Sequence, residues 1–150
     1  MLDIKRKLLE AAKVLVEKKI NTSESAVASA IESKLNETKS TAGDKFETGR
    51  AMMQVEQEKS EMRLAQANQL MNKLKHLDLE KKYTTAAIGA LVTTDQHNYF
   101  LSIGIGKLVI DDQIYYAISE LSPIGKLLIG KMKGEAVEFR QEVIRIKEIY

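Results

Sequence analysis

The chain has no cysteine and no tryptophan, and it has one proline and two histidines in 150 residues. Without cysteine there are no disulfides, thiolate nucleophiles or thiolate metal ligands, which suits a reducing compartment, and we expect a cytoplasmic protein. No apolar run approaches the roughly 20 residues that a membrane span needs, and no apolar signal segment follows the first charges. We therefore expect no membrane association.

The sequence also lacks a self-sufficient active site. His76 and His97 have no partner at metal-ligand spacing, and no Ser-His-Asp arrangement can be argued from them. The stretch Gly104-Ile105-Gly106 lacks the third glycine and the strand-to-helix context of a dinucleotide site. We predict that the chain is not an enzyme by itself, that it holds no cofactor of its own and that it is a monomer.

Proline and glycine are missing from long stretches on both sides of Gly43 and Gly49. Two glycines inside such helix-friendly sequence mark the place where the chain can reverse. We predict a long antiparallel coiled-coil hairpin over residues 1–80 with its tip near residues 41–50. Arms of about 36 residues would each be roughly 54 Å long.

Apolar spacing sets the expected faces of this hairpin. The Asn21-Thr22-Ser23-Glu24 stretch resembles a helix N-cap, so we expect the first helix to bend or restart there. The second helix is expected from about Asp44 to about Leu79. The first helix is expected to bury Ile4, Leu8, Ala11 and Leu15, then Val16, Ile20, Val27, Ile31 and Leu35. The second helix is expected to bury Met53, Gln57, Ser60, Leu64, Ala67, Leu70 or Met71, Leu74 and Leu77.

Residues 85–150 carry strand and turn patterns instead. Strands are expected over residues 86–92 and over residues 99–106, the second with a bulge or sharp bend at Gly104 and Gly106 inside it. A hairpin around Asp111 and two further strands are expected to follow. Ser122 is a natural N-cap, Pro123 a natural first helical residue and Gly130 a natural helix stop. The fold class is therefore α+β: the helical hairpin, then an antiparallel sheet with one short helix. We expect residues 85–150 to complete their own core and fold alone.

Charge is distributed unevenly although the net charge is only +2. Residues 1–23 sum to +3, residues 24–62 to −3, residues 63–84 to +3 and residues 85–150 to −1. One interpretation is solvated helix faces with a random imbalance. The other is an acidic arm that seeks a cationic or metal-bearing site. In this interpretation the positively charged end of the hairpin, opposite the tip, can face DNA or RNA.

Two carboxylates, Asp44 and Glu47, lie at the expected start of the second helix. They can cap free N–H groups and complement the helix dipole. Alternatively, at positions i and i+3 they can share a divalent cation with ligands from outside the chain. Two carboxylates alone are too few to hold magnesium tightly, and the residues by themselves leave both interpretations open.

Three stretches of the C-terminal half form a recognisable set. They are Ser122-Pro123-Ile124-Gly125-Lys126-Leu127-Leu128-Ile129-Gly130-Lys131, then Gly134-Glu135-Ala136-Val137-Glu138-Phe139, and then Val143-Ile144-Arg145-Ile146. With these stretches the C-terminal half resembles the C-terminal domain of the Gre family of bacterial transcript-cleavage factors. The order of strands, short helix and strands is similar too, as is the stretch Ile88-Gly89-Ala90-Leu91-Val92.

This resemblance implies an FKBP-like globular domain over residues 85–150 that docks on RNA polymerase, preceded by a coiled coil that enters the secondary channel. It implies that Asp44 and Glu47, supplied in trans, help to hold a magnesium ion shared with the polymerase. The polymerase then cleaves the 3′ end of backtracked nascent RNA, and the chain is a catalytic accessory in transcription elongation. The sequence departs from the family at Arg50 and Ala51, where the family has glutamate and tyrosine.

The docking surface is expected to include Ser122, Pro123, Ile124 and Gly125, because an apolar residue beside a proline at a helix start is rigid. The alternative is that Ile124 packs into the core. Three other functions remain open. They are a channel-binding regulator without cleavage, which Arg50 favours; a prolyl isomerase, which few aromatic residues disfavour; and a coiled-coil adaptor with no polymerase affinity.

Overall fold

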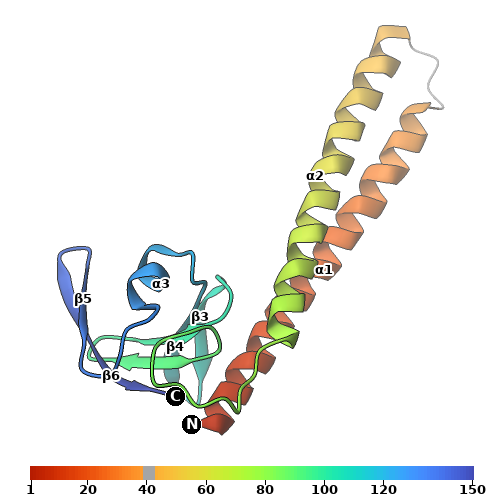
Figure 1. Cartoon of the computed structure of the whole chain (residues 1–150). Helices are drawn as coiled ribbons and strands as arrows, with labels where there is room; N and C mark the ends of the chain where they lie inside the picture. The colour runs from red at the N-terminus through yellow and green to blue at the C-terminus, as the bar shows by residue number, and fades with distance from the viewer. Residues whose placement is uncertain (39–42) are drawn as a thin grey trace. The chain divides into compact units, whose positions relative to one another are not determined.

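The structure is a computed structural model that describes residues 1–38 and 43–150. It divides into two compact units: Met1–Leu15 together with Asn72–Tyr150, and Val16–Met71. The first unit contains a sheet and the second is a helical hairpin (Figure 1). The predicted boundaries, 1–80 and 85–150, stay a prediction, although the first fifteen residues group with the sheet.

Two long helices form the predicted hairpin. Helix α1 spans Leu2–Thr38 and helix α2 spans Gly43–Lys75. The restart expected at Asn21–Glu24 is wrong, because α1 is helical through this stretch without a break. A cap is useful only where helical hydrogen bonds stop. Helix α2 ends at Lys75, four residues before the expected Leu79. The next two amides, of His76 and Leu77, donate to carbonyls only three residues back, those of Lys73 and Leu74.

The seam of the hairpin repeats every seven residues with small side chains. Within the hairpin unit, the buried residues of α1 are Val16, Ser23 and Ala30, and those of α2 include Ser60 and Ala67. This is the coiled-coil spacing of 3.5 residues per turn. The expected burial of Ile31 and Leu35 is wrong, since they are 40% and 57% exposed and Ala30 takes the seam position instead.

Six strands form one sheet in the order β3-β4-β2-β1-β6-β5. The predicted all-antiparallel sheet is wrong at one pair, because β2 and β4 run parallel with Phe100 opposite Ala117. The sheet is therefore mixed, and the α+β class with one short helix is confirmed. The strands are β1 (Leu91–Thr94), β2 (Asn98–Leu101), β3 (Gly106–Ile110), β4 (Gln113–Ile118), β5 (Ala136–Phe139) and β6 (Glu142–Ile149).

The first strand begins later than its apolar alternation predicts. Residues 88–89 form a turn, and Gly89 has φ +92°. A β-carbon at Gly89 would come within 2.3 Å of the Tyr83 hydroxyl, which donates to the Ile88 carbonyl at 2.9 Å. The chain therefore turns where a regular strand was expected. The strand expected over residues 99–106 is too long, since β2 ends at Leu101 and β3 begins at Gly106. The predicted bend at Gly104 is confirmed.

The central strands are apolar on both faces. Leu91 and Phe100, which are paired across β1 and β2, belong to one buried cluster, and the next pair, Val92 and Tyr99, belongs to another. Successive side chains of a strand point to opposite faces, so both faces of this sheet need a cover. The second cluster contains Ile124 and Leu128 of α3, the short helix Pro123–Leu128.

The first turns of α1 cover the other face. Leu8 is fully buried and belongs to the cluster of Leu91, Phe100 and Tyr115, against which Ile4 and Leu15 also pack. The expectation that residues 85–150 complete their own core is therefore wrong. One face of the sheet is completed by residues from the opposite end of the chain.

Lys5 makes polar contacts in this same segment. Its ammonium donates to the Tyr150 carbonyl at 3.3 Å and lies 4.7 Å from the centroid of the Tyr83 ring. Burial lowers the pKa of Lys5, and the nearby Asp78 carboxylate opposes that shift. Lys7 also forms an ion pair with Asp111 at 2.8 Å. The first helix turns are thus fixed to the sheet unit by polar as well as apolar contacts.

The short helix α3 follows the sequence prediction. The Ser122 side chain caps it by accepting from the Gly125 amide at 3.1 Å, Pro123 is its first residue, and Gly130 follows the C-cap with φ +80°. Gly125 is required by packing, because a β-carbon there would lie 2.0 Å from the Ser119 carbonyl oxygen. Among the described residues, no helix has the length and apolar character to span a membrane.

The cover that α1 gives the sheet can be tested with Leu8→Ala. The lost side chain is fully buried, so the free energy of unfolding should fall by about 2–5 kcal/mol. Leu121→Ala removes the same atoms from a side chain that is 68% exposed and serves as the control. Equal effects of the two changes in urea unfolding would contradict this role of Leu8.

A second test concerns the seam of the hairpin. The Ser60 hydroxyl is buried and has no hydrogen-bond partner among the described residues. An unpaired buried polar group costs about 1–3 kcal/mol, so Ser60→Ala should stabilise the hairpin and raise its midpoint of thermal unfolding. Ser29→Ala on the exposed side of α1 is the control, since it gains only helix propensity. A Ser60→Ala gain no larger than this control would refute the account.

Candidate functional site

The predicted acidic pair lies at the start of α2. Asp44 is in the first turn of this helix, and its side chain lies outside the described residues. Glu47, one turn further on, is exposed. Arg50 is exposed too, and the described residues show no ion pair between it and Glu47. The Glu47 carboxylate is therefore available to a ligand or partner from outside.

Polar bonds join the two helices behind this end of α2. The Lys34 ammonium on α1 donates to the Gln54 side-chain oxygen on α2, and the Gln54 amide donates to Glu58 at 3.0 Å. Gln54 lies two helical turns after Glu47. Apolar side chains nearby are left in water, since Met52 and Val55 are 63% and 49% exposed.

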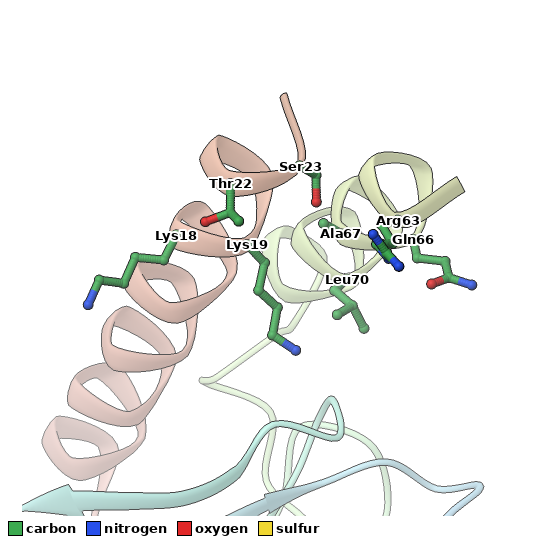
Figure 2. Close-up of a pocket in the computed structure, with 8 residues that line it drawn as sticks. All are labelled: Lys18, Lys19, Thr22, Ser23, Arg63, Gln66, Ala67 and Leu70. Carbon is green, nitrogen blue, oxygen red and sulfur yellow. The ribbon is translucent and has the colours of Figure 1, made fainter. Parts of the chain in front are cut away.

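A pocket of about 370 Å³ lies between α1 and α2 further along the hairpin (Figure 2). Small seam residues leave this space: Ser23 of α1 and Ala67 of α2 both line it. In Figure 2, Lys19 extends between the helices toward Leu70, whereas Lys18 points to the outer side of α1. The remaining lining residues are Thr22, Arg63 and Gln66.

The four expected docking residues have unequal access to the surface. Ile124 is only 8% exposed and packs in the sheet cluster, so the structure favours the core alternative for its side chain. Gly125 is buried, and the Ser122 hydroxyl donates to the Ser119 carbonyl at 2.7 Å. Of the four residues, Pro123 alone is exposed. A docking role for this stretch stays a prediction and would rest on Pro123.

Aromatic rings gather beside Pro123, around a pocket of about 370 Å³. The ring of His97 meets those of Tyr99 and Tyr116 edge-on, with centroids 6.1 Å and 5.1 Å apart. Phe139 also lines the pocket, and the Arg140 guanidinium lies 5.0 Å from its ring centroid. Burial, and secondarily Tyr116, raises the pKa of Tyr99.

Sequence reasoning missed both pockets. Their residues come from segments far apart in the chain, so no local pattern joins Lys19 to Arg63 or His97 to Phe139. The signal for the hairpin pocket was the +3 charge of residues 1–23 and of residues 63–84. The predicted tip residues Asp44 and Glu47 share the start of one helix, as expected from their spacing.

The raised pKa of Tyr99 predicts a pH dependence. In the unfolded chain a tyrosine loses its proton near pH 10, whereas Tyr99 in the folded chain keeps it to higher pH. Stability is therefore lost as the pH rises through 10. Tyr99→Phe should leave stability at pH 7 nearly unchanged and should lose less between pH 9 and pH 11 in urea unfolding. Equal alkaline losses in both proteins would contradict the assignment.

The comparisons with known proteins end at the level of a distant structural likeness. No protein-family model matches the chain. No curated protein matches it either. A solved structure described as the transcription factor Gfh1 is similar over 93% of this chain and 94% of that chain, with 16% sequence identity and a TM-score of 0.40.

Proposed function

We propose that the chain is an accessory factor of RNA polymerase. In this proposal the hairpin enters the secondary channel, the sheet unit docks outside, and the tip stimulates cleavage of backtracked RNA. The single observation that carries it is an exposed Glu47 three residues after Asp44, at the start of a 33-residue helix. That helix is roughly 50 Å long and carries both carboxylates at its first turns.

Two further features support the proposal. The short helix with its Ser122 cap, Pro123 start and Gly130 stop is formed as the Gre-like stretch implies. Exposed apolar residues on the distal hairpin, such as Met52 and Val55, suit a segment that is covered when it enters a partner.

The chemistry requires little of this chain. In a two-metal site one ion activates the attacking water and the other stabilises the leaving oxygen. Carboxylate oxygens are the ligands that magnesium prefers, and the ion usually keeps several waters. Two carboxylates alone are too few to hold such an ion tightly. Asp44 and Glu47 would thus lend ligands to an ion that the polymerase also holds, and they would bind it weakly alone.

Arg50 supports a second candidate, a channel-binding regulator that does not promote cleavage. It occupies the position where the Gre-like motif has a third acid, and its side chain is exposed. Its positive charge one turn from Glu47 lowers the local affinity for a cation. The two candidates share the hairpin and the sheet unit and differ only in what the tip does.

Transcript cleavage in a stalled, backtracked elongation complex distinguishes them. We expect the wild type to release a 3′ RNA fragment and Asp44→Asn to cleave more than about tenfold more slowly, a barrier increase above about 1.4 kcal/mol. Added magnesium should partly restore the Asp44→Asn rate, because mass action offsets weaker binding. Arg50→Glu should stimulate cleavage faster than the wild type does.

Glu32→Gln is the matched control, since it removes a carboxylate from an exposed position on α1. It should cleave like the wild type, and both Asp44→Asn and Glu32→Gln should bind polymerase equally well. Equal cleavage by the wild type and Asp44→Asn across a magnesium titration would show that the acids only cap the helix. Binding without any cleavage would favour the regulator, and no binding would favour the adaptor.

The aromatic pocket supports a third candidate, the binding or isomerisation of a proline-containing peptide. Four rings gather where the sequence alone suggested too few. Aromatic side chains with a few polar groups among them are typical of ligand pockets, and here Tyr99, Tyr116 and His97 supply the polar groups. A proline-peptide isomerisation assay with the wild type and Phe139→Ala tests it, and no difference from the uncatalysed rate would exclude the activity.

A further inference from the structure

The pocket between α1 and α2 is positively charged and lacks acids. Of its eight lining residues, Lys18, Lys19 and Arg63 are cationic and none is a carboxylate. Within the described residues, Lys18 and Lys19 form no ion pair, and Arg63 reaches Glu56 only at 3.9 Å. That pair is well exposed, so it contributes at most about 1 kcal/mol and leaves the guanidinium free to exchange partners.

The pocket also has an apolar side. Ala67 is 4% exposed and Leu70 is half-buried, and both line it. Ser23, itself 9% exposed, and Thr22 add hydroxyl groups, and Gln66 adds an amide. Cations beside an apolar surface with a few hydrogen-bonding groups fit a ligand that has both a charged and a flat apolar part.

Phosphate is the charged group that these residues favour. An arginine guanidinium binds phosphate through two parallel N–H bonds, and a lysine ammonium adds a mobile positive charge. In Figure 2, Lys19 extends between the helices toward Leu70, which places a cation beside the apolar part of the pocket. A volume of about 370 Å³ lies within the ordinary range for small-molecule sites.

We propose that this pocket binds a free nucleotide, with its phosphates at Lys19 and Arg63 and its base or sugar over Ala67 and Leu70. The inference goes beyond the proposed function and does not rest on it. It uses neither Asp44 nor Glu47, so the nucleotide site and the tip can each fail without the other.

Calorimetry on the full chain at about 0.15 M salt, with EDTA present, tests the proposal using three probes. These are ATP, inorganic tripolyphosphate and adenosine. Tripolyphosphate carries only the phosphates, and adenosine carries only the base and the sugar. ATP should bind more tightly than either of the others. Lys19→Gln and Arg63→Gln should each weaken ATP binding about tenfold, the loss of roughly 1.4 kcal/mol from one charge-assisted contact.

Lys107→Gln is the matched control, because it removes one exposed positive charge from the sheet unit. It should leave ATP affinity unchanged, and amide NMR shifts on ATP addition should centre on Ser23 and Ala67. The proposal is overturned if tripolyphosphate binds as tightly as ATP, or if Lys107→Gln weakens ATP as much as Lys19→Gln. It is also overturned if ATP does not bind while a short single-stranded RNA does.

Discussion

A sheet whose central strands are apolar on both faces needs two covers, and this requirement organises the first unit. The period of two along β1 and β2 assigns Leu91 and Phe100 to one face and Val92 and Tyr99 to the other. Helix α3 lies close behind in the chain and supplies one cover, through Ile124 and Leu128. The other cover comes from α1, and the buried Leu8 is its centre. The same helix continues into the hairpin, so its sequence must satisfy a sheet at one end and a helical partner further on.

Local chemistry made some elements predictable. Helix α3 begins and ends where three residues indicate. Ser122 caps it with its side chain, and Pro123 and Gly130 act through their backbone geometry. Patterns that depend on distant partners failed. The parallel pairing of β2 with β4 leaves no local signal, and neither does the role of Leu8. The 3.5-residue repeat correctly predicts the buried Ser60 and Ala67 of α2. On the outer part of α1 it favours the large Ile31, whereas the buried residue there is Ala30.

The candidate sites follow the same division. Asp44 and Glu47 are close in sequence, so their shared place at a helix start could be predicted, and the resemblance gave them a role. Ile124 was ambiguous because burial is a tertiary property, and the structure favours the core alternative for it. The cations of the hairpin pocket come from two helices whose register is set by small seam residues. The charge sum of +3 on each segment shows that the cations are present, but it does not show that Lys19 and Arg63 line the same pocket.

The position of Leu8 has a consequence for how the protein is made. Its cluster includes Ala117, which the ribosome adds more than a hundred residues later. At ~5–20 residues per second, Leu8 waits on the order of 5–20 s for its partners. During that interval α1 can already pair with α2, whose residues are complete well before the sheet. The hairpin can thus form early in synthesis, while the side of α1 that carries Leu8 stays open to chaperones until the last strands appear.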